Sequence, residues 1–214
     1  MYVPNGVFMD GSYMGGMLQN EPTLTYEVGS KERRVLESTI KRYQKECEEI
    51  PIIIGGQEFK TDKAVYQVSP FNHKSKIAKF YYATPELVSK SIVAAKEAQK
   101  KWEQVPFEER LKIWFKAADL ISGPYRQKLN CATMLGQGKT VIQCEIDAAA
   151  ELADFIRFNA LYARDMLKWQ PVSETPNVIK NSMRLRGLEG FVAAVSPFNF
   201  TAIGGNLAYT PALM

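Results

Sequence analysis

The sequence predicts an α/β protein, and three observations support that class. Apolar residues alternate in short runs between residues 52 and 82, which is typical of small antiparallel strands. From residue 84 to residue 168 they recur every three or four positions, which indicates helices. The uninterrupted apolar run at residues 191–195 precedes a turn, and such a run is typical of a strand buried in a parallel sheet.

Composition narrows the classes of function. Of the 214 residues, 46% are hydrophobic and 23% are charged, as in globular proteins. The 27 Lys and Arg residues exceed the 23 Asp and Glu residues by only four and are spread through the chain, so we expect no nucleic-acid partner. Three cysteines without a Cys-x-x-Cys pair, and the single histidine His73, argue against a disulfide framework and against a metal site.

The first helix is expected after a flexible lead-in at residues 1–29, which contain four methionines and five glycines. These residues include no Lys or Arg, which disfavours a mitochondrial transit peptide and a basic secretion leader. Ser30 is the predicted N-cap, since Leu36 and Ile40 continue an apolar helical face. The helix should end before Pro51.

A small antiparallel patch should follow that helix. Residues 52–59 predict a short hairpin that turns at Gly55-Gly56. Residues 65–68 and 77–82 predict two further strands on either side of a turn.

Four helices are predicted between residues 84 and 168. The first has Thr84 as N-cap and an apolar face from Leu87 to Trp102. The second starts at Pro106, the third covers about 125–135, and the fourth covers about 140–168. The expected inward residues are Leu111, Trp114, Phe115 and Ala118 in the second helix, and Ile142, Ile146, Ala149, Ala153, Ile156, Ala160 and Ala163 in the fourth.

The pattern changes again after residue 169. Prolines break the helix, and residues 177–188 alternate loosely, as expected of one or two exposed strands. The buried strand at 191–195 should lead through a turn at 196–200 into a helix from residue 201. Residues 190–214 carry no charge, but their prolines, asparagines and paired glycines favour a buried core over a membrane span.

The sequence Gly136-Gln137-Gly138-Lys139-Thr140 looks like the end of a phosphate-binding loop. That loop requires a glycine five positions before Gly138, where Thr133 stands, and a strand in front of it instead of a helix. We therefore interpret Gly136 and Gly138 as a helix C-cap, and Thr140 as the N-cap of the next helix.

A more informative position is the turn after the run at 191–195. Ligands of open parallel sheets bind beyond the carboxyl ends of the strands, where the following helix offers free N–H groups. Asn199 stands there between Phe198 and Phe200. A side-chain amide can donate a hydrogen bond to a developing oxyanion. The residues alone leave open whether Asn199 does so or only caps the helix.

These segments resemble the aldehyde dehydrogenase superfamily, whose Pro-aromatic-Asn-Phe segment is matched by Pro197-Phe198-Asn199-Phe200. The resemblance covers roughly residues 20–214 and is greatest to the Δ1-pyrroline-5-carboxylate (L-glutamate γ-semialdehyde) dehydrogenases of proline breakdown. The stretches that carry it are 66–73, 116–119, 136–143, 145–152 and 187–208.

The resemblance implies an aldehyde dehydrogenase-like α/β fold with a helical lead-in, small antiparallel strands and the first βα unit of a Rossmann-type cofactor domain. Residues 30–169 and 187–214 would form part of the NAD-binding domain. Residues 170–186 would start an oligomerisation hairpin, which implies a homo-oligomer. The expected cofactor is NAD, and the expected substrate is a small aldehyde, with no nucleic acid and no membrane as partner.

The resemblance also implies roles for individual residues. Asn199 would stabilise the oxyanion that forms when a cysteine thiolate adds to the aldehyde. The segment Ser196-Pro197-Phe198 would contact NAD. Phe200 would pack on the aliphatic chain of the substrate, and Glu151 would bind its ammonium end, since a carboxylate holds an ammonium group well.

Two departures from the family pattern limit these expectations. None of Cys47, Cys131 and Cys144 lies in the family's nucleophile motif, and its general-base glutamate has no match, so we expect no activity from these 214 residues alone. The family implies the mitochondrial matrix, whereas the absence of a basic leader in residues 1–29 favours the cytoplasm.

Three functions therefore stay open at the level of the sequence. The chain is part of an NAD-dependent dehydrogenase that oxidises L-glutamate γ-semialdehyde to L-glutamate, or a truncated product that binds full-length homologues, or a generic nucleotide-binding module.

Overall fold

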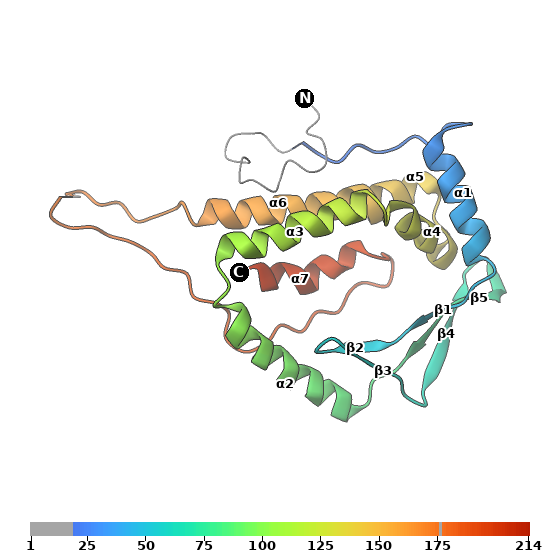
Figure 1. The fold of residues 1–214 in the computed structure, drawn as a ribbon, viewed down its shortest axis with the longest axis horizontal. Coiled ribbons are helices and arrows are strands. Elements are labelled where there is room, and N and C mark those ends of the chain that lie inside the picture. The colour runs from blue at the N-terminus through green and yellow to red at the C-terminus, as the bar shows by residue number, and fades with distance from the viewer. Residues whose placement is uncertain (1–18, 176) are drawn as a thin grey trace.

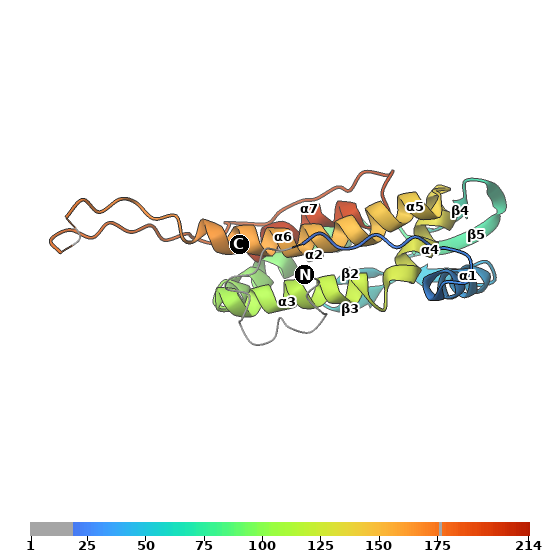
Figure 2. The same cartoon turned by 90° about the horizontal axis from the view of Figure 1, so that it is seen from above.

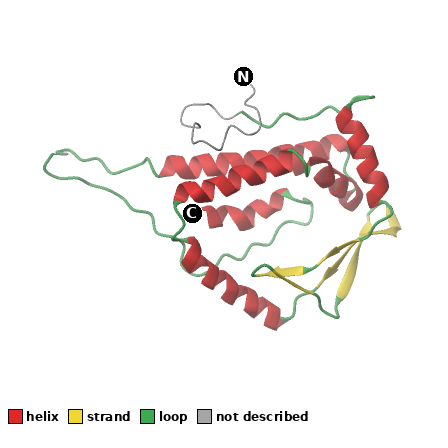
Figure 3. Cartoon of the chain, viewed as in Figure 1, coloured by secondary structure: helices red, strands yellow, loops and turns green. Residues whose placement is uncertain are grey.

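A computed structural model describes residues 19–175 and 177–214. Its helices lie side by side in a flat arrangement, and the short strands gather at one end (Figures 1, 2 and 3). This mixture confirms the predicted α/β class. Residues 1–18, which belong to the predicted flexible lead-in, lie outside the described residues.

Three features organise the chain: a group of long helices, two small sheets, and a two-armed segment at residues 170–186 that projects away from the helices (Figure 1). The helices are α1 (Lys31–Tyr43), α2 (Pro85–Trp102), α3 (Phe107–Ser122), α4 (Arg126–Gln137), α5 (Val141–Cys144), a π-helical turn at Glu145–Ala150, α6 (Glu151–Met166), a 3₁₀ turn at Ile203–Gly205 and α7 (Asn206–Leu213). The strands are β1 (Glu48–Ile50), β2 (Ile52–Ile54), β3 (Gln57–Phe59), β4 (Ala64–Ser69) and β5 (Asn72–Tyr81).

Hydrogen bonds at the helix ends form where the sequence predicts them. The hydroxyls of Ser30 and Thr84 each accept a bond from the backbone N–H three residues further on, at 3.2 and 3.3 Å. Thr140 forms a reciprocal capping box with Gln143. Gly138 ends α4 with a φ of 66°, in the left-handed region that glycine adopts without strain. Local chemistry is therefore enough to place these boundaries.

The strands form a three-stranded sheet in the order β1-β5-β4 and a separate hairpin of β2 and β3. The hairpin confirms the prediction for residues 52–59, and both of its turn glycines, Gly55 and Gly56, have positive φ. Strands β4 and β5 are antiparallel, as predicted. No sequence pattern predicted β1, which runs parallel to β5 with Glu48 opposite Ala78.

The main core lies between α3, α6 and α7. The predicted inward face of α3 is confirmed, because it packs against Leu152, Ile156, Ala160 and Ala163 of α6 and against Leu213 of α7. Two predicted inward residues of the long helix, Ile142 and Ile146, are instead 50% and 41% exposed. Ile142 lies in α5, just before the π-helical turn, and Ile146 lies within the turn. The wider winding of the turn changes which side of this helical run faces the core.

Helix α2 lies at the edge of the molecule, and none of its side chains is fully buried (Figure 1). The apolar face predicted from Leu87 to Trp102 therefore does not reach the core. Only Trp102 approaches it, packing partly buried against the core residues. Within the described residues, no helix combines the length and the apolar character needed to cross a membrane.

The strand predicted at 191–195 is not formed. The segment pairs with none of the described strands, and Val195 is 88% exposed. A parallel strand needs neighbouring strands to bond its N–H and C=O groups, and the described part of the chain offers none beside this segment. The helix predicted from residue 201 is confirmed from Ile203 onward, first as a 3₁₀ turn and then as α7.

The one or two strands predicted at 177–188 are also not formed in the described residues. Side-chain bonds join the two arms of the 170–186 segment instead. Asn181 donates from its backbone to Ser173 Oγ and from its side chain to the carbonyl of Val172, both at 2.9 Å. The arms are thus held together without a regular ladder.

Candidate functional site

Asn199 lies on an exposed loop in front of the 3₁₀ turn, which we call the Asn199 loop (residues 196–202). The 3₁₀ turn has Ala202 as N-cap and α7 has Gly205, with no side-chain cap bond at either. The alternative that Asn199 only caps the helix is therefore wrong. Asn199 is exposed, and it lies in the turn after residues 191–195 where the sequence predicted ligand binding.

The Asn199 loop packs closely onto the residues that follow it. A Cβ atom on Gly204 would lie 3.0 Å from the Cβ of Ser196, so a larger residue at this position would require Ser196 to shift by a few tenths of an ångström. Phe198 is 97% exposed, whereas Phe200 is partly buried. The predicted cofactor residues Ser196-Pro197-Phe198 thus form one exposed turn with a fixed base.

Glu151 lies at a different place, in the wall of a cavity of about 380 Å³ beside α6. Asp154 supplies a second carboxylate to the same cavity. Carboxylates together with the faces of aromatic rings attract cations. The remaining lining residues are Asn20, Phe155, Phe158, Asn159 and Tyr162.

The structure does not place Asn199 or Phe200 in the lining of the Glu151 cavity. It connects the two regions through α7. Asn159, which lines the cavity, donates to Asn206 Oδ1 at 2.8 Å and to Thr210 Oγ1 at 3.1 Å. The helix that follows the Asn199 loop is therefore bonded to the cavity wall.

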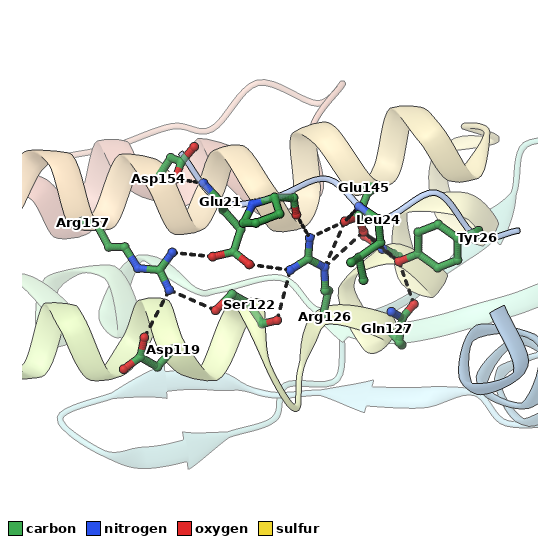
Figure 4. Close-up of polar contacts among 12 residues, drawn as sticks. Glu21, Leu24, Tyr26, Asp119, Ser122, Arg126, Gln127, Glu145, Asp154 and Arg157 are labelled. Atoms are coloured by element: carbon green, nitrogen blue, oxygen red, sulfur yellow. Dashed lines mark hydrogen bonds and ion pairs between the residues drawn. The ribbon is translucent and has the colours of Figure 1, made fainter. Parts of the chain in front are cut away.

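The N-terminal side of the cavity is formed by the chain before α1. Asp154 Oδ2 accepts from the Asn20 side chain at 2.8 Å, and Asp154 Oδ1 accepts from the backbone N–H of Glu21 at 2.7 Å. Residues 20–26 then run along the helices as an extended segment (Figure 4). No motif in the sequence predicted that Asn20 would line a cavity, because its contact with Asp154 spans 134 residues.

A buried polar network fixes this extended segment (Figure 4). The Glu21 carboxylate lies between two guanidinium groups, 2.7 Å from Arg126 and 2.5 Å from Arg157. Asp119 of α3 pairs with Arg157 at 3.2 Å. We call this set, with Glu145, the buried network. It joins α3, α4 and α6 to the wall of the Glu151 cavity.

Glu145 is the most enclosed acid of the buried network, with 1% of its surface exposed. Its oxygens accept from Leu24 N at 2.8 Å, Tyr26 Oη at 2.7 Å, Asn130 Nδ2 at 2.8 Å and the Arg126 guanidinium. Burial alone would raise the pKa of Glu145, but the bonds from Arg126, Leu24 and Tyr26 outweigh burial and lower it. Glu145 is thus held as a carboxylate inside the protein.

Two of the three cysteines are buried thiols that are poorly suited to act as nucleophiles. Burial raises the pKa of Cys131 to about 11 and that of Cys144 to about 12, so both thiols stay protonated near neutral pH. Cys47 is exposed. Across the described residues, no cluster of three or more His, Cys, Asp or Glu side chains is placed to hold a metal ion.

Residues 58–214 match the model of the aldehyde dehydrogenase family. The chain belongs to this family. Over 195 residues it is 55% identical to the human protein named Delta-1-pyrroline-5-carboxylate dehydrogenase, mitochondrial, an alignment that covers 91% of this chain and 34% of the human protein. The Agaricus bisporus protein named Delta-1-pyrroline-5-carboxylate dehydrogenase is 48% identical over 198 residues, covering 92% of this chain and 36% of that protein.

A solved structure agrees with this family membership. The crystal structure of the Delta-pyrroline-5-carboxylate dehydrogenase from Mycobacterium tuberculosis bound with NAD superposes with a TM-score of 0.89 at 40% identity. The match covers 94% of this chain and 37% of that chain. This aldehyde dehydrogenase chain therefore spans about a third of the length of its curated relatives. The predicted family and fold are confirmed.

Proposed function

We propose that this chain acts within an NAD-dependent aldehyde dehydrogenase that oxidises L-glutamate γ-semialdehyde to L-glutamate. The observation that carries the proposal is its 55% identity, over nearly its whole length, to the human protein named above. The activity is proposed for an enzyme that contains these residues, because the chain spans about a third of the relatives.

In this proposal Asn199 is the oxyanion donor. Addition of a nucleophile to an aldehyde turns the carbonyl oxygen into an oxyanion, and the Asn199 side-chain amide would donate to it. Freedom from a helix-capping bond leaves that amide available. A donor of this kind is worth about 10² to 10³ in rate.

Glu151 would recognise the amino-acid end of the substrate. Asp154 already accepts two hydrogen bonds from residues 20 and 21, whereas no donor among the described residues engages the Glu151 carboxylate. An incoming ammonium group would therefore pair with Glu151 beside the aromatic side chains of the cavity. Phe200 would contact the aliphatic part of the substrate.

The turn Ser196-Pro197-Phe198 fits one wall of an NAD site. It is exposed, and it approaches Gly204 closely at the start of the following helix, where an added Cβ would crowd Ser196. When bound, NAD accepts the hydride that leaves the substrate carbon. The Mycobacterium tuberculosis relative, solved bound with NAD, supports the choice of NAD as the cofactor.

A chimera tests the proposal. Residues 20–214 of this chain would replace the matching third of the human relative, and NAD reduction would be measured with L-glutamate γ-semialdehyde. We expect an active enzyme in which Asn199→Ala lowers kcat by about 10² to 10³ with little change in the KM for NAD. The matched control is Asn72→Ala, which removes an exposed asparagine at the start of β5. An unchanged kcat in the Asn199 variant would contradict the oxyanion role.

We also propose that the 170–186 segment mediates homo-oligomer formation. It projects from the helices and exposes Val172 by 79%, Val178 by 81% and Ile179 by 59%. Exposed apolar side chains of this kind are typical of association surfaces. The same surface favours a second candidate function, a product that binds full-length homologues. Co-purification with the full-length human relative, lost on Val178→Asp, would support it, and failure to co-purify would exclude it.

For the location we propose the mitochondrial matrix, because the human, bovine and zebrafish relatives are named as mitochondrial proteins. Fractionation of cells that express the natural gene product tests this, and recovery in the cytosol would contradict it.

A further inference from the structure

The last residue of α4 and the loop that joins α4 to α5 contact the Asn199 loop on both sides of Asn199. Gln137 Nε2 donates to the carbonyl of Phe198 at 3.2 Å. Lys139 Nζ lies 4.5 Å from the centre of the Phe200 ring. Both side chains belong to the Gly136–Thr140 motif that lacks the requirements of a phosphate-binding loop. The contacts of Gln137 and Lys139 therefore indicate a structural role for this motif, in which it holds the Asn199 loop.

The α4–α5 loop is itself firmly held, so it can serve as an anchor. Lys139 forms an ion pair with Asp147 of the π-helical turn, with only 20% and 12% of the two side chains exposed. A Cβ atom on Gly138 would lie 3.4 Å from Pro70, so the loop packs directly on the turn between β4 and β5. Thr140 adds the capping box at the start of α5.

We propose that Gln137 and Lys139 are positioning residues that clamp the Asn199 loop. Gln137 fixes the backbone just before Asn199, and Lys139 fixes the ring just after it. The loop makes no regular backbone ladder of its own, so these side-chain contacts restrict where the Asn199 amide points. The catalytic value of the clamp rests on the proposed oxyanion role of Asn199, whereas the clamp as a structural device does not.

Limited digestion of the 214-residue chain with chymotrypsin tests the clamp, with cleavage sites identified by mass spectrometry. Lys139→Met should speed cleavage after Phe198 and Phe200 about five-fold, the fold-change that corresponds to loss of a cation–π contact worth about 1 kcal/mol. Cleavage after Tyr162 in α6 serves as the internal reference for global unfolding. Protease access to a loop reports its local opening.

The matched control is Lys128→Met. Lys128 also makes one ion pair, with Glu48 at 2.8 Å, and one ring contact, with Tyr43 at 5.9 Å, on another part of the surface. It should leave cleavage after Phe198 and Phe200 unchanged.

Rescue separates a specific clamp from general damage. Lys139→Arg keeps both the charge and the cation–π contact, so it should restore wild-type cleavage. The proposal is overturned if Lys139→Met leaves the ratio of Phe200 to Tyr162 cleavage unchanged, or raises it without rescue by arginine.

Should the Lys139→Met variant fail to fold, Gln137→Ala tests the contact between Gln137 and the backbone of Phe198. Faster cleavage after Phe198 is expected, and an unchanged rate would contradict the clamp. None of these rates depends on aldehyde oxidation, so failure of the clamp and failure of the proposed function are distinguishable.

Discussion

Neutralising Glu145 should strongly destabilise the fold. Four groups donate to its carboxylate: Leu24 N, Tyr26 Oη, Asn130 Nδ2 and the Arg126 guanidinium. Glu145→Gln keeps the shape but places an NH₂ group, itself a donor, against some of these donors. It also removes one of the two carboxylates that compensate Arg126, which is only 5% exposed.

The loss of stability in Glu145→Gln depends on which partners Arg126 keeps. Removing one partner of a buried ion pair costs about 3–5 kcal/mol. Glu21 still pairs with Arg126 at 2.7 Å, so we expect the lower end, about 3 kcal/mol. For a chain of this size that corresponds to a Tm lower by about 6–12 °C. Thermal unfolding of the 214-residue chain, followed by circular dichroism, measures it.

The matched control is Glu109→Gln. Glu109 pairs with Lys112 at 2.6 Å on the surface of α3, where both side chains are more than half exposed. Such a pair is worth about 0.5 kcal/mol or less. If Glu145→Gln lowers Tm no more than Glu109→Gln does, the buried network does not stabilise the fold as described.

Lowering the pH should remove the contribution that Glu145 makes to the free energy of unfolding. The pKa of Glu145 is lower in the folded state than the ordinary value of 4.5. The folded state therefore binds fewer protons there, so the contribution of Glu145 to stability is present above the unfolded pKa and is lost as pH falls through the folded pKa. Between about pH 5 and about pH 3 the wild type should lose more stability than Glu145→Gln. Parallel curves would contradict this.

Three further predictions concern the cavity, a helix end and the thiols. In the active chimera, Glu151→Gln should raise the KM for the semialdehyde about ten-fold while changing kcat less, because a charged hydrogen bond is worth about 1.5–3 kcal/mol; an unchanged KM would exclude the ammonium contact. Gly138→Ala should cost about 1–2 kcal/mol, since alanine is strained at a φ of 66°, and Gly138→Asn should cost less; denaturant titration compares them. Alkylation at pH 8 should label Cys47 first, because burial raises the pKa values of Cys131 and Cys144; equal labelling rates in a mass-spectrometric time course would contradict this.

The parts of the fold that local chemistry determines were predictable. Ser30, Thr84, Thr140 and Gly138 mark helix ends because each acts through a hydrogen bond or a backbone angle within a few residues. The hairpin at residues 52–59 was predictable for the same reason, since two glycines allow its turn.

Features that depend on distant partners were not predictable. The run at 191–195 has a buried strand's composition, but a strand forms only where other strands meet it. The contacts of Asn20 and Glu21 with Asp154 span more than 130 residues, and no spacing in the sequence signals them. Likewise, the sequence argued against a phosphate-binding role for Lys139 but gave no sign of its contact with Phe200, which lies 61 residues away in the chain.

The π-helical turn at Glu145–Ala150 sets the direction of Glu145 relative to α6. A π turn accommodates one residue more than an α-helix would, and each residue of an α-helix turns the chain by about 100°. If the same residues wound as a regular α-helix, Glu145 would be rotated by about 100° relative to α6 and away from Arg126. The π winding therefore lets Glu145 face Arg126 while α6 keeps its own apolar face on the core, and the buried Ala148, Ala149 and Ala150 leave little room for larger side chains at this point.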